Sequence, residues 1–126
     1  MTNQDQQSAA MDFLDLAFNQ GDPEKAVSQY VGKSYVQHNP QVPDGGDALI
    51  EFVHTFRKQF PEMHLETKRS VTEDGMVVTH SHLTLTPGEP GLAIADFFRF
   101  EGGKMVEHWD VIQNIPETSA NSNGMV

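Results

Sequence analysis

The apolar residues of this sequence change their period once, at Pro61, and that change constrains the fold more than any other feature. Before Pro61, the segment 47–60 repeats apolar residues at the spacing of one helix face: Leu49, Phe52, Val53, Phe56 and Phe60. After Pro61, apolar and β-branched residues alternate with polar ones, as is typical of strands. Four strands are predicted, at residues 63–74, 76–86, 92–101 and 104–115. Helices followed by an antiparallel meander predict an α+β fold rather than alternating βαβ units.

Two more helices are predicted ahead of the long one. Residues 5–20 have a helical apolar face that ends at Gly21, and a short second helix begins at Asp22 and ends at Gly32. Aspartate is a good N-cap, and glycine just past the last turn is a common stop signal. The long helix has to cover one face of the sheet. If the sheet curls around it, the two elements enclose a pocket walled by alternate strand residues.

Composition limits the class of protein. The 126 residues carry a net charge of −10 with a pI near 4.8, which argues against nucleic acid or an anionic membrane as a partner. There is no cysteine, so there is no disulfide framework or cysteine-held metal. No signal-peptide pattern and no apolar run of roughly 18 residues occur, so we expect a cytoplasmic protein. We expect a single domain over residues 1–126, with a core at about 8–116 and a polar tail at 117–126.

The last predicted strand, "KMVEHWDVIQ", places an imidazole beside a carboxylate. Strict alternation puts Val106, His108, Asp110 and Ile112 on one face, and Met105, Glu107, Trp109 and Val111 on the other. The same rule gives one face of 92–101 as Ile94, Asp96, Phe98 and Phe100, and one face of 76–86 as Val78, His80, His82 and Thr84. We expect these three faces to line the pocket.

Each of these residues also has a structural interpretation. Asp96 or Asp110 could pair with a buried cationic group, His108 could be a hydrogen-bonded core residue, and Trp109 could pack against a helix or a second subunit. His80 and His82, with His38 as a third ligand, could hold a metal, although nothing in the spacing fixes a third ligand. We therefore predict no metal and no cofactor. Phosphate-loop, dinucleotide-binding and serine-hydrolase motifs are absent from the sequence.

Three stretches carry a resemblance to a known family: "YVQHNP", "DALIEFV" and above all "ADFFRFEGGKMVEHWDVIQ". They resemble the SnoaL-like polyketide cyclase family, which lies within the nuclear-transport-factor-two-like superfamily, over roughly residues 8–116. The resemblance implies a cone-shaped curved antiparallel sheet wrapped around the long helix. It also implies a deep pocket and, usually, a dimer.

The resemblance also implies a site. In the characterised cyclases, an aspartate of the last strand is the acid/base of an intramolecular aldol condensation that needs no cofactor, and this position falls on Asp110. A position that is often histidine in the cyclases falls on Asp96. From the residues themselves, a carboxylate in an apolar pocket has a raised pKa and is a better base. His108, His80 or a protonated Asp96 could then donate to the developing oxyanion. The predicted pocket or binding residues are His38, His80, His82, Phe98 and Trp109.

Three functions stay open from the sequence. The first is a cofactor-independent lyase or isomerase, of the aldol-type cyclase kind, acting on a small hydrophobic carbonyl compound. The second is a non-catalytic module of the same fold that binds a small molecule or dimerises, since fold alone does not fix function. The third, implied by the resemblance because the superfamily also supports it, is epoxide hydrolysis, which needs two aspartates bracketing an arginine in one pocket. Arg99 is predicted to point away from Asp96, which counts against it.

A homodimer is predicted through the outer face of the sheet. The apolar residues assigned to that face, Met105, Trp109 and Val111, would be wet in a monomer.

Overall fold

The computed structural model describes all residues, 1–126, and has the predicted order of helices followed by strands. Its elements are α1 (Asn3–Leu14), a π-helical turn η1 (Asp15–Asn19), α2 (Pro23–Tyr30), β1 (Val31–Gln37), α3 (Gly46–Gln59), β2 (His64–Glu73), β3 (Met76–Thr84), β4 (Leu92–Glu101) and β5 (Lys104–Asn114). The α+β prediction is confirmed. None of the helices combines the length and apolarity that crossing a bilayer requires.

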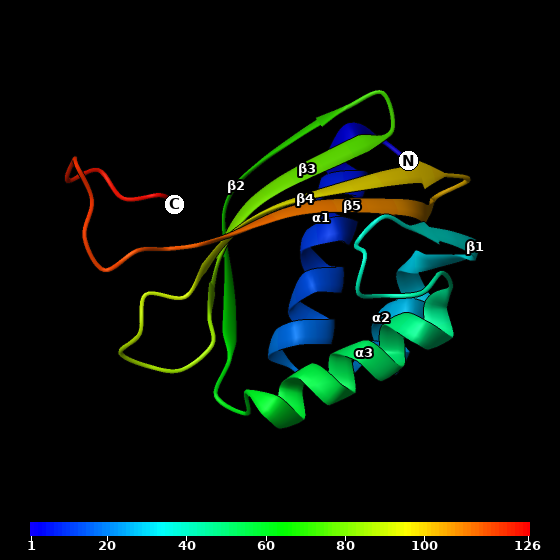
Figure 1. Cartoon of the computed structure of the whole chain (residues 1–126). Coiled ribbons are helices and arrows are strands. Elements are labelled where there is room, and N and C mark those ends of the chain that lie inside the picture. The colour runs from blue at the N-terminus through cyan, green and yellow to red at the C-terminus, as the bar shows by residue number, and fades with distance from the viewer.

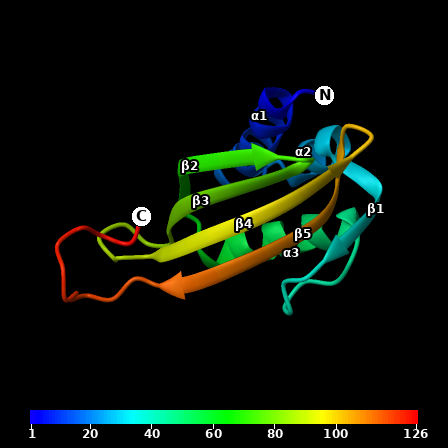
Figure 2. The same cartoon turned by 90° about the horizontal axis from the view of Figure 1, so that it is seen from above.

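The five strands form one curved, open sheet in the order β1-β5-β4-β3-β2. β2 to β5 are antiparallel neighbours, as the meander predicted, whereas β1 pairs with β5 in parallel at the edge. Figure 1 shows the strands arching over α1, with α2 and α3 on the same concave side. Figure 2, from above, shows the strands crossing over α3 and the C-terminal tail leaving the sheet. All three helices therefore cover one face and leave the other bare.

The helix α3 divides its apolar face between the core and an open space. Leu49 and Val53 are buried in the hydrophobic core together with Phe98 and Met105. Phe52 and the two phenylalanines that follow it on the same face are only half-buried. The first half of the amphipathic helix thus packs against the core, while its second half borders a cavity.

The two predicted hairpin turns are confirmed by their backbone angles. Asp74 and Gly75 have φ values of +51° and +78°, and Gly102 and Gly103 have +58° and +80°. Positive φ at both central residues defines the type I′ turn, whose twist matches that of the flanking strands. These tight turns fix the register of β2 with β3 and of β4 with β5.

A β-bulge in β5 corrects one face assignment made from the sequence. Arg99 pairs with Glu107, but the next residue, Phe100, pairs with Met105, so Val106 is the extra residue. A bulge shifts the alternation of side chains by one. The prediction that Met105 faces outward is wrong: its side chain is fully buried beside the inward-facing Phe100.

Candidate active site

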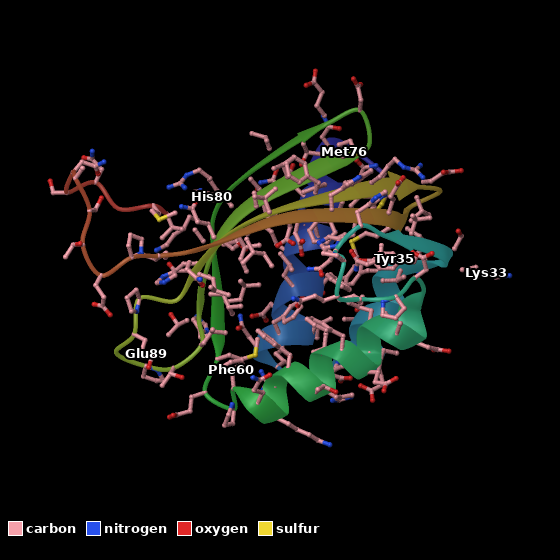
Figure 3. The ribbon with its side chains drawn as sticks, viewed as in Figure 1. Lys33, Tyr35, Phe60, Met76, His80 and Glu89 are labelled. Carbon is pink, nitrogen blue, oxygen red and sulfur yellow. The ribbon has the colours of Figure 1, made fainter.

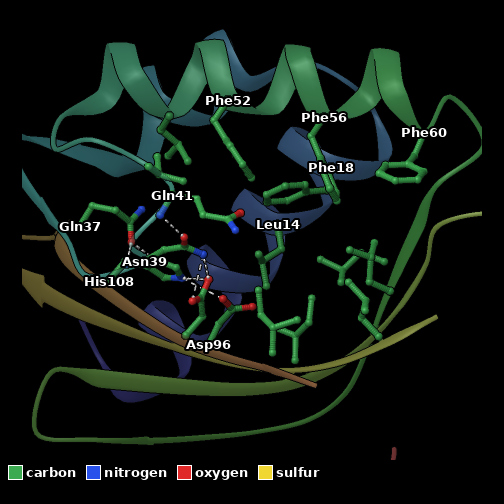
Figure 4. A pocket seen from close by; sticks show the side chains of 18 of the residues that line it. Leu14, Phe18, Gln37, Asn39, Gln41, Phe52, Phe56, Phe60, Asp96 and His108 are labelled. Atoms are coloured by element: carbon green, nitrogen blue, oxygen red, sulfur yellow. Dashed lines mark hydrogen bonds and ion pairs between the residues drawn. The ribbon is translucent and has the colours of Figure 1, made fainter. Parts of the chain in front are cut away.

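A cavity of about 660 Å³ lies between α3, the concave face of the sheet and the loop that follows β1. Figure 4 shows Phe52, Phe56 and Phe60 reaching into it from the helix, opposite Asp96 and His108 on the strands. Its apolar wall consists mainly of Leu14, Phe18, Val42, Leu49, Phe52, Phe56, Phe60, Leu65, Leu83, Leu92, Ile94 and Ile112. Its polar wall consists mainly of Gln37, Asn39, Gln41, Asp96, His108, Asp110 and Asn114. No lysine or arginine lines it.

The cavity opens to solvent between three elements. The exposed lining residues come from the loop after β1 (Pro40 and Gln41), from α3 (Thr55 and Gln59) and from the end of β5 (Ile112 and Asn114). This ring of mostly polar residues leads inward to the apolar chamber. A small molecule can therefore reach the polar wall from outside.

The strand register sets two aspartates directly across from each other. Asp96 of β4 pairs with Asp110 of β5, and two residues further along, on the same face, Phe98 pairs with His108. Like charges in directly opposed positions repel, so a pair of ionised carboxylates here would be destabilising. The surrounding side chains show how each aspartate is accommodated.

Asp96 is hydrogen-bonded to His108. The Oδ1 atom of Asp96 lies 2.8 Å from Nε2 of His108, and both side chains are about one-tenth exposed. Burial raises the pKa of the Asp96 carboxyl. The His108 hydrogen bond acts in the opposite direction, and the charge of Asp110 adds to the rise. Asp96 is therefore harder to ionise than an exposed aspartate.

Gln37 determines which nitrogen of His108 carries hydrogen. The Oε1 atom of Gln37 accepts the backbone N–H groups of His38 and Asn39, each at 3.1 Å, which identifies this atom as oxygen. The same atom lies 2.7 Å from Nδ1 of His108. An amide oxygen only accepts, so Nδ1 must donate. Nε2 of His108 and Oδ1 of Asp96 then share one further proton in their 2.8 Å hydrogen bond.

Asp110 has a different environment. Its two carboxylate oxygens accept hydrogen bonds from Nδ2 of Asn39 at 3.1 and 2.9 Å. The other end of that amide, Oδ1, accepts the Gln41 backbone N–H at 2.9 Å, which fixes the amide orientation. The nearest imidazole atom, Nε2 of His108, is 4.0 Å from Asp110 Oδ2. Asp110 is therefore held by a neutral amide, without a cationic partner and beside the cavity.

The same three residues offer ligand atoms for an ion. One atom each from Asp96, His108 and Asp110 lies within 4.8 Å of the others. However, Nε2 of His108 is already in a 2.8 Å hydrogen bond, which a cation would have to displace. The arrangement as it stands is suited to moving protons: an acid bonded to an imidazole, with a second carboxylate alongside.

Two predicted pocket residues lie on the wrong face. Thr79, not His80, pairs with Asp96, so His80 and His82 point to the outer side of the sheet. Figure 3 shows His80 there, on the side away from the helices. Arg69 bonds to Nδ1 of His80, and His82 donates to the Pro90 carbonyl at 2.8 Å. Alternation alone fixed which residues share a face of β3, but not which face turns inward.

The other predicted residues surround the site without lining the cavity. Phe98 is fully buried and packs beside the His108 ring, with centroids 5.1 Å apart. His38 and Trp109 lie on the outer face, where their rings stack at 4.7 Å. The prediction that these three residues line the pocket is wrong. Asp96, His108 and Asp110 do meet on the cavity wall, and Arg99 points outward to Glu107 as expected.

Sequence reasoning missed three residues of the stretch "YVQHNP". Tyr35, Gln37 and Asn39 follow a period of two, which in an extended segment puts them on one face. Gln37 and Asn39 reach the site as described. Burial raises the pKa of Tyr35, with the nearby charges of Asp96 and Asp110 adding to the rise. The signal was present in the sequence, but nothing there indicated that this segment pairs with β5.

Comparisons with known proteins agree with this architecture. A family model described as "SnoaL-like domain" matches residues 10–108. TsrD from Streptomyces laurentii is 21% identical with a TM-score of 0.75, covering 89% of this chain and 90% of its own. A candidate polyketide cyclase from Bacillus cereus is 22% identical with a TM-score of 0.75, covering 86% and 74%. A candidate isomerase of the SnoaL-like family from Agrobacterium tumefaciens is 12% identical with a TM-score of 0.75, covering 88% and 99%. No curated protein sequence matches the chain.

Proposed function

We propose that this chain, which belongs to the SnoaL-like family, is a cofactor-independent acid/base enzyme of the aldol-type cyclase or isomerase kind. The observation that carries the proposal is the contrast on the cavity wall. Asp110 is hydrogen-bonded by the Asn39 amide, whereas the opposite carboxyl group, Asp96, is buried in a 2.8 Å hydrogen bond to His108. We infer from burial and from this bond that Asp96 is the group that keeps a proton. A base and an acid in adjacent positions are what enolisation of a carbonyl compound needs.

In the proposed reaction, Asp110 removes a proton from the carbon next to a carbonyl group. The electron pair of that C–H bond moves into the carbonyl, and negative charge develops on its oxygen. In the free protein the proton of the Asp96–His108 pair lies in the hydrogen bond between the two side chains. In the proposed reaction the Asp96 O–H turns from Nε2 of His108 toward the substrate oxygen and stabilises it by donating to it. In a cyclisation the enolate carbon attacks a second carbonyl of the same molecule, and the new alkoxide is protonated by the acid that formed on Asp110. No electron carrier or metal is needed for this balance.

The cavity wall favours a neutral, mostly apolar substrate. Two carboxyl groups line the cavity and no lysine or arginine does, so a substrate carboxylate would have no cationic partner. The phenylalanine row of α3 offers flat apolar surface, with Phe52 and Phe56 stacked at 5.6 Å. Aromatic surface of this kind suits a planar or ring-containing ligand. The substrate proposed is therefore a small hydrophobic carbonyl compound, consistent with the polyketide cyclase named among the similar structures.

The second candidate is a non-catalytic binding protein of the same fold. The epoxide hydrolase alternative has less support, because Arg99 bonds to Glu107 and Glu101 on the outer face and cannot stand between the two aspartates. A salt bridge from Asp110 to arginine or lysine would have favoured the binding protein, and no such bridge is present. The open cavity mouth and the amide-held carboxylate favour catalysis.

Proton exchange tests the proposal without knowledge of the natural substrate. The purified protein is incubated in D₂O with 2-tetralone, a neutral ring ketone, and loss of the α-proton signal is followed by NMR. We expect exchange above the buffer rate, and Asp110→Asn should lower that excess by roughly 10²–10⁴-fold with little change in melting temperature. Asp47→Asn, at an exposed aspartate outside the cavity, is the matched control. Ketone binding without any accelerated exchange would instead support the binding protein.

We also propose a homodimer through the outer face of the sheet, without a contribution from Met105. Val111 is 65% exposed and Trp109 lies beside it on that face. The helices all cover the opposite face, so a second copy is the natural cover for these residues. Light scattering at micromolar concentration should give twice the 14.0 kDa mass, and a monomer mass would refute this assembly.

A further inference from the structure

His38 lies outside the cavity, yet it sits between the two residues that hold the site. Gln37, His38 and Asn39 follow one another where β1 ends, and β1 runs parallel to β5 with Gln37 opposite His108. The His38 backbone N–H donates to the His108 carbonyl at 3.0 Å. Because side chains alternate, Gln37 and Asn39 point inward and His38 points outward.

The inward side chains of this segment make matched pairs with β5. Gln37 accepts from His108 at 2.7 Å, and Asn39 donates to Asp110 at 2.9 Å. Each therefore determines the orientation of one group that the proposed reaction uses. A shift of residues 37–39 along β5 would disturb both pairs together.

The outward side chain lies between the two outer residues of the same stretch of β5. The His38 ring is stacked on Trp109, with centroids 4.7 Å apart and planes 6° from parallel. Its Nε2 atom bonds to Oε2 of Glu107 at 2.7 Å. Glu107 is itself fixed, since its other oxygen accepts from Nε of Arg99 at 2.8 Å. His38 thus rests on a platform that belongs to the neighbouring strands.

We propose that His38 is a positioning residue that keeps Gln37 and Asn39 in register with His108 and Asp110 from the opposite face of the sheet. The proposal rests on the proposed function for its catalytic consequence, but not for its structural one. The other side-chain bonds of the segment are local. Gln37 N–H donates to Asp44 at 2.8 Å and Gln41 N–H to Asn39 at 2.9 Å, so these bonds would move with the loop. Residues 38–39, which lie beyond β1, are joined to β5 by the Asn39 amide, the His38 ring and one backbone hydrogen bond.

A small displacement of residues 37–39 along β5 is expected to lower the reaction rate strongly. A misplacement of about 1 Å can cost on the order of 10²-fold in rate when reacting groups must be aligned. Loss of His38 should therefore lower turnover without removing any group that touches the substrate. It should also loosen the hydrogen bond between Gln37 and His108, which can be observed directly.

The test follows the Nδ1–H proton of His108 by ¹⁵N-edited NMR in the free protein. In His38→Ala its exchange with solvent should accelerate about tenfold or more, and its resonance should shift. In His38→Phe, which keeps a flat ring to stack on Trp109, most of the protection should return. His54→Ala is the matched control, because the partly exposed His54 also bonds to a glutamate, at 2.9 Å, far from the site.

A second readout is 2-tetralone exchange, in which His38→Ala should lower the maximal rate about tenfold with little change in the half-saturating ketone concentration. Unchanged exchange and chemical shift of the His108 Nδ1–H in His38→Ala would overturn the proposal. So would a loss of protection that His54→Ala reproduces, since that would reflect global stability alone. If the wild-type protein does not exchange 2-tetralone, the proposed function fails. Faster exchange of the His108 proton in His38→Ala would still support the positioning role.

Discussion

Asp96 offers a direct test of where the buried proton resides. Gln37 fixes Nδ1 of His108 as a donor, and burial raises the pKa of Asp96. We infer from these two observations that the Asp96 carboxyl donates to Nε2 of His108. An asparagine at this position carries an N–H that can replace the acid O–H in the same hydrogen bond. Asp96→Asn should therefore be tolerated, whereas Asp96→Ala should leave Nε2 buried without a partner.

The size of the difference follows from burial. Asp96 is only 6% exposed, and leaving a buried polar group unsatisfied costs about 1–3 kcal/mol. At roughly 2.1 cal/mol/K per residue, unfolding 126 residues has an entropy of about 0.26 kcal/mol/K. Asp96→Ala should thus lower the melting temperature by roughly 4–11 °C. Asp96→Asn should lower it by less than about 4 °C.

Thermal unfolding followed by circular dichroism at pH 7 measures both variants, with Asp110→Asn as a control that keeps its contact to Asn39. Equal losses in the alanine and asparagine variants of Asp96 would refute the assignment of a neutral acid. In that case the pair would carry charge, because removing one partner of a buried ion pair is costly whatever replaces it.

Two further outcomes follow from the same groups. In calorimetry, the neutral ester methyl 2-naphthoate should bind at least about tenfold more tightly than the anion 2-naphthoate. The reason is that two carboxyl groups and no lysine or arginine line the cavity. Equal affinities would contradict a neutral substrate. Burial raises the pKa of Asp96 above 3.8, so the native state binds this proton more tightly than the unfolded state does. The resulting stability is present below about pH 3.8 and is lost as pH rises through the folded pKa. The difference in melting temperature, Asp96→Asn minus wild type, should therefore increase as pH rises from about 3.8 through the folded pKa. A decrease would show that the native state lowers the pKa of Asp96 instead of raising it.

The helices and the meander could be predicted because their signals are local. The apolar spacing of α3, the Asp22 cap and the glycine turns each depend on a few neighbouring residues, and each appears where expected. The presence of Asp96 and Asp110 on the same cavity wall also followed from alternation, because both residues were assigned to strand faces expected to line the pocket. The contacts that Gln37 and Asn39 make with the site could not be predicted, because the parallel pairing of β1 with β5 joins residues about 70 positions apart in the sequence.

The errors in assigning the faces of β3 and β5 have two physical causes. Met105 was misplaced because a bulge adds one residue to β5, and no single residue in that stretch marks it. His80 and His82 were misplaced because Val77, Thr79, Ser81 and Leu83 form the buried face of β3, so two small polar residues lie inside while the imidazoles lie outside. Thr79 and Ser81 are small enough to fit beneath the crowded centre of the sheet, which residue type alone did not reveal.

The two opposed aspartates have different surroundings, which suit the two roles given to them in the proposed function. In the proposed function Asp96 keeps its proton, and in the free protein that proton lies in the hydrogen bond to His108, whose other nitrogen is held by Gln37. Keeping that proton removes one of two charges that the strand register would otherwise oppose. Asp110 has the Asn39 amide as its donor and adjoins the apolar cavity. In the proposed function, a proton kept on Asp96 is therefore what allows a second carboxyl group to act as a base directly across from it.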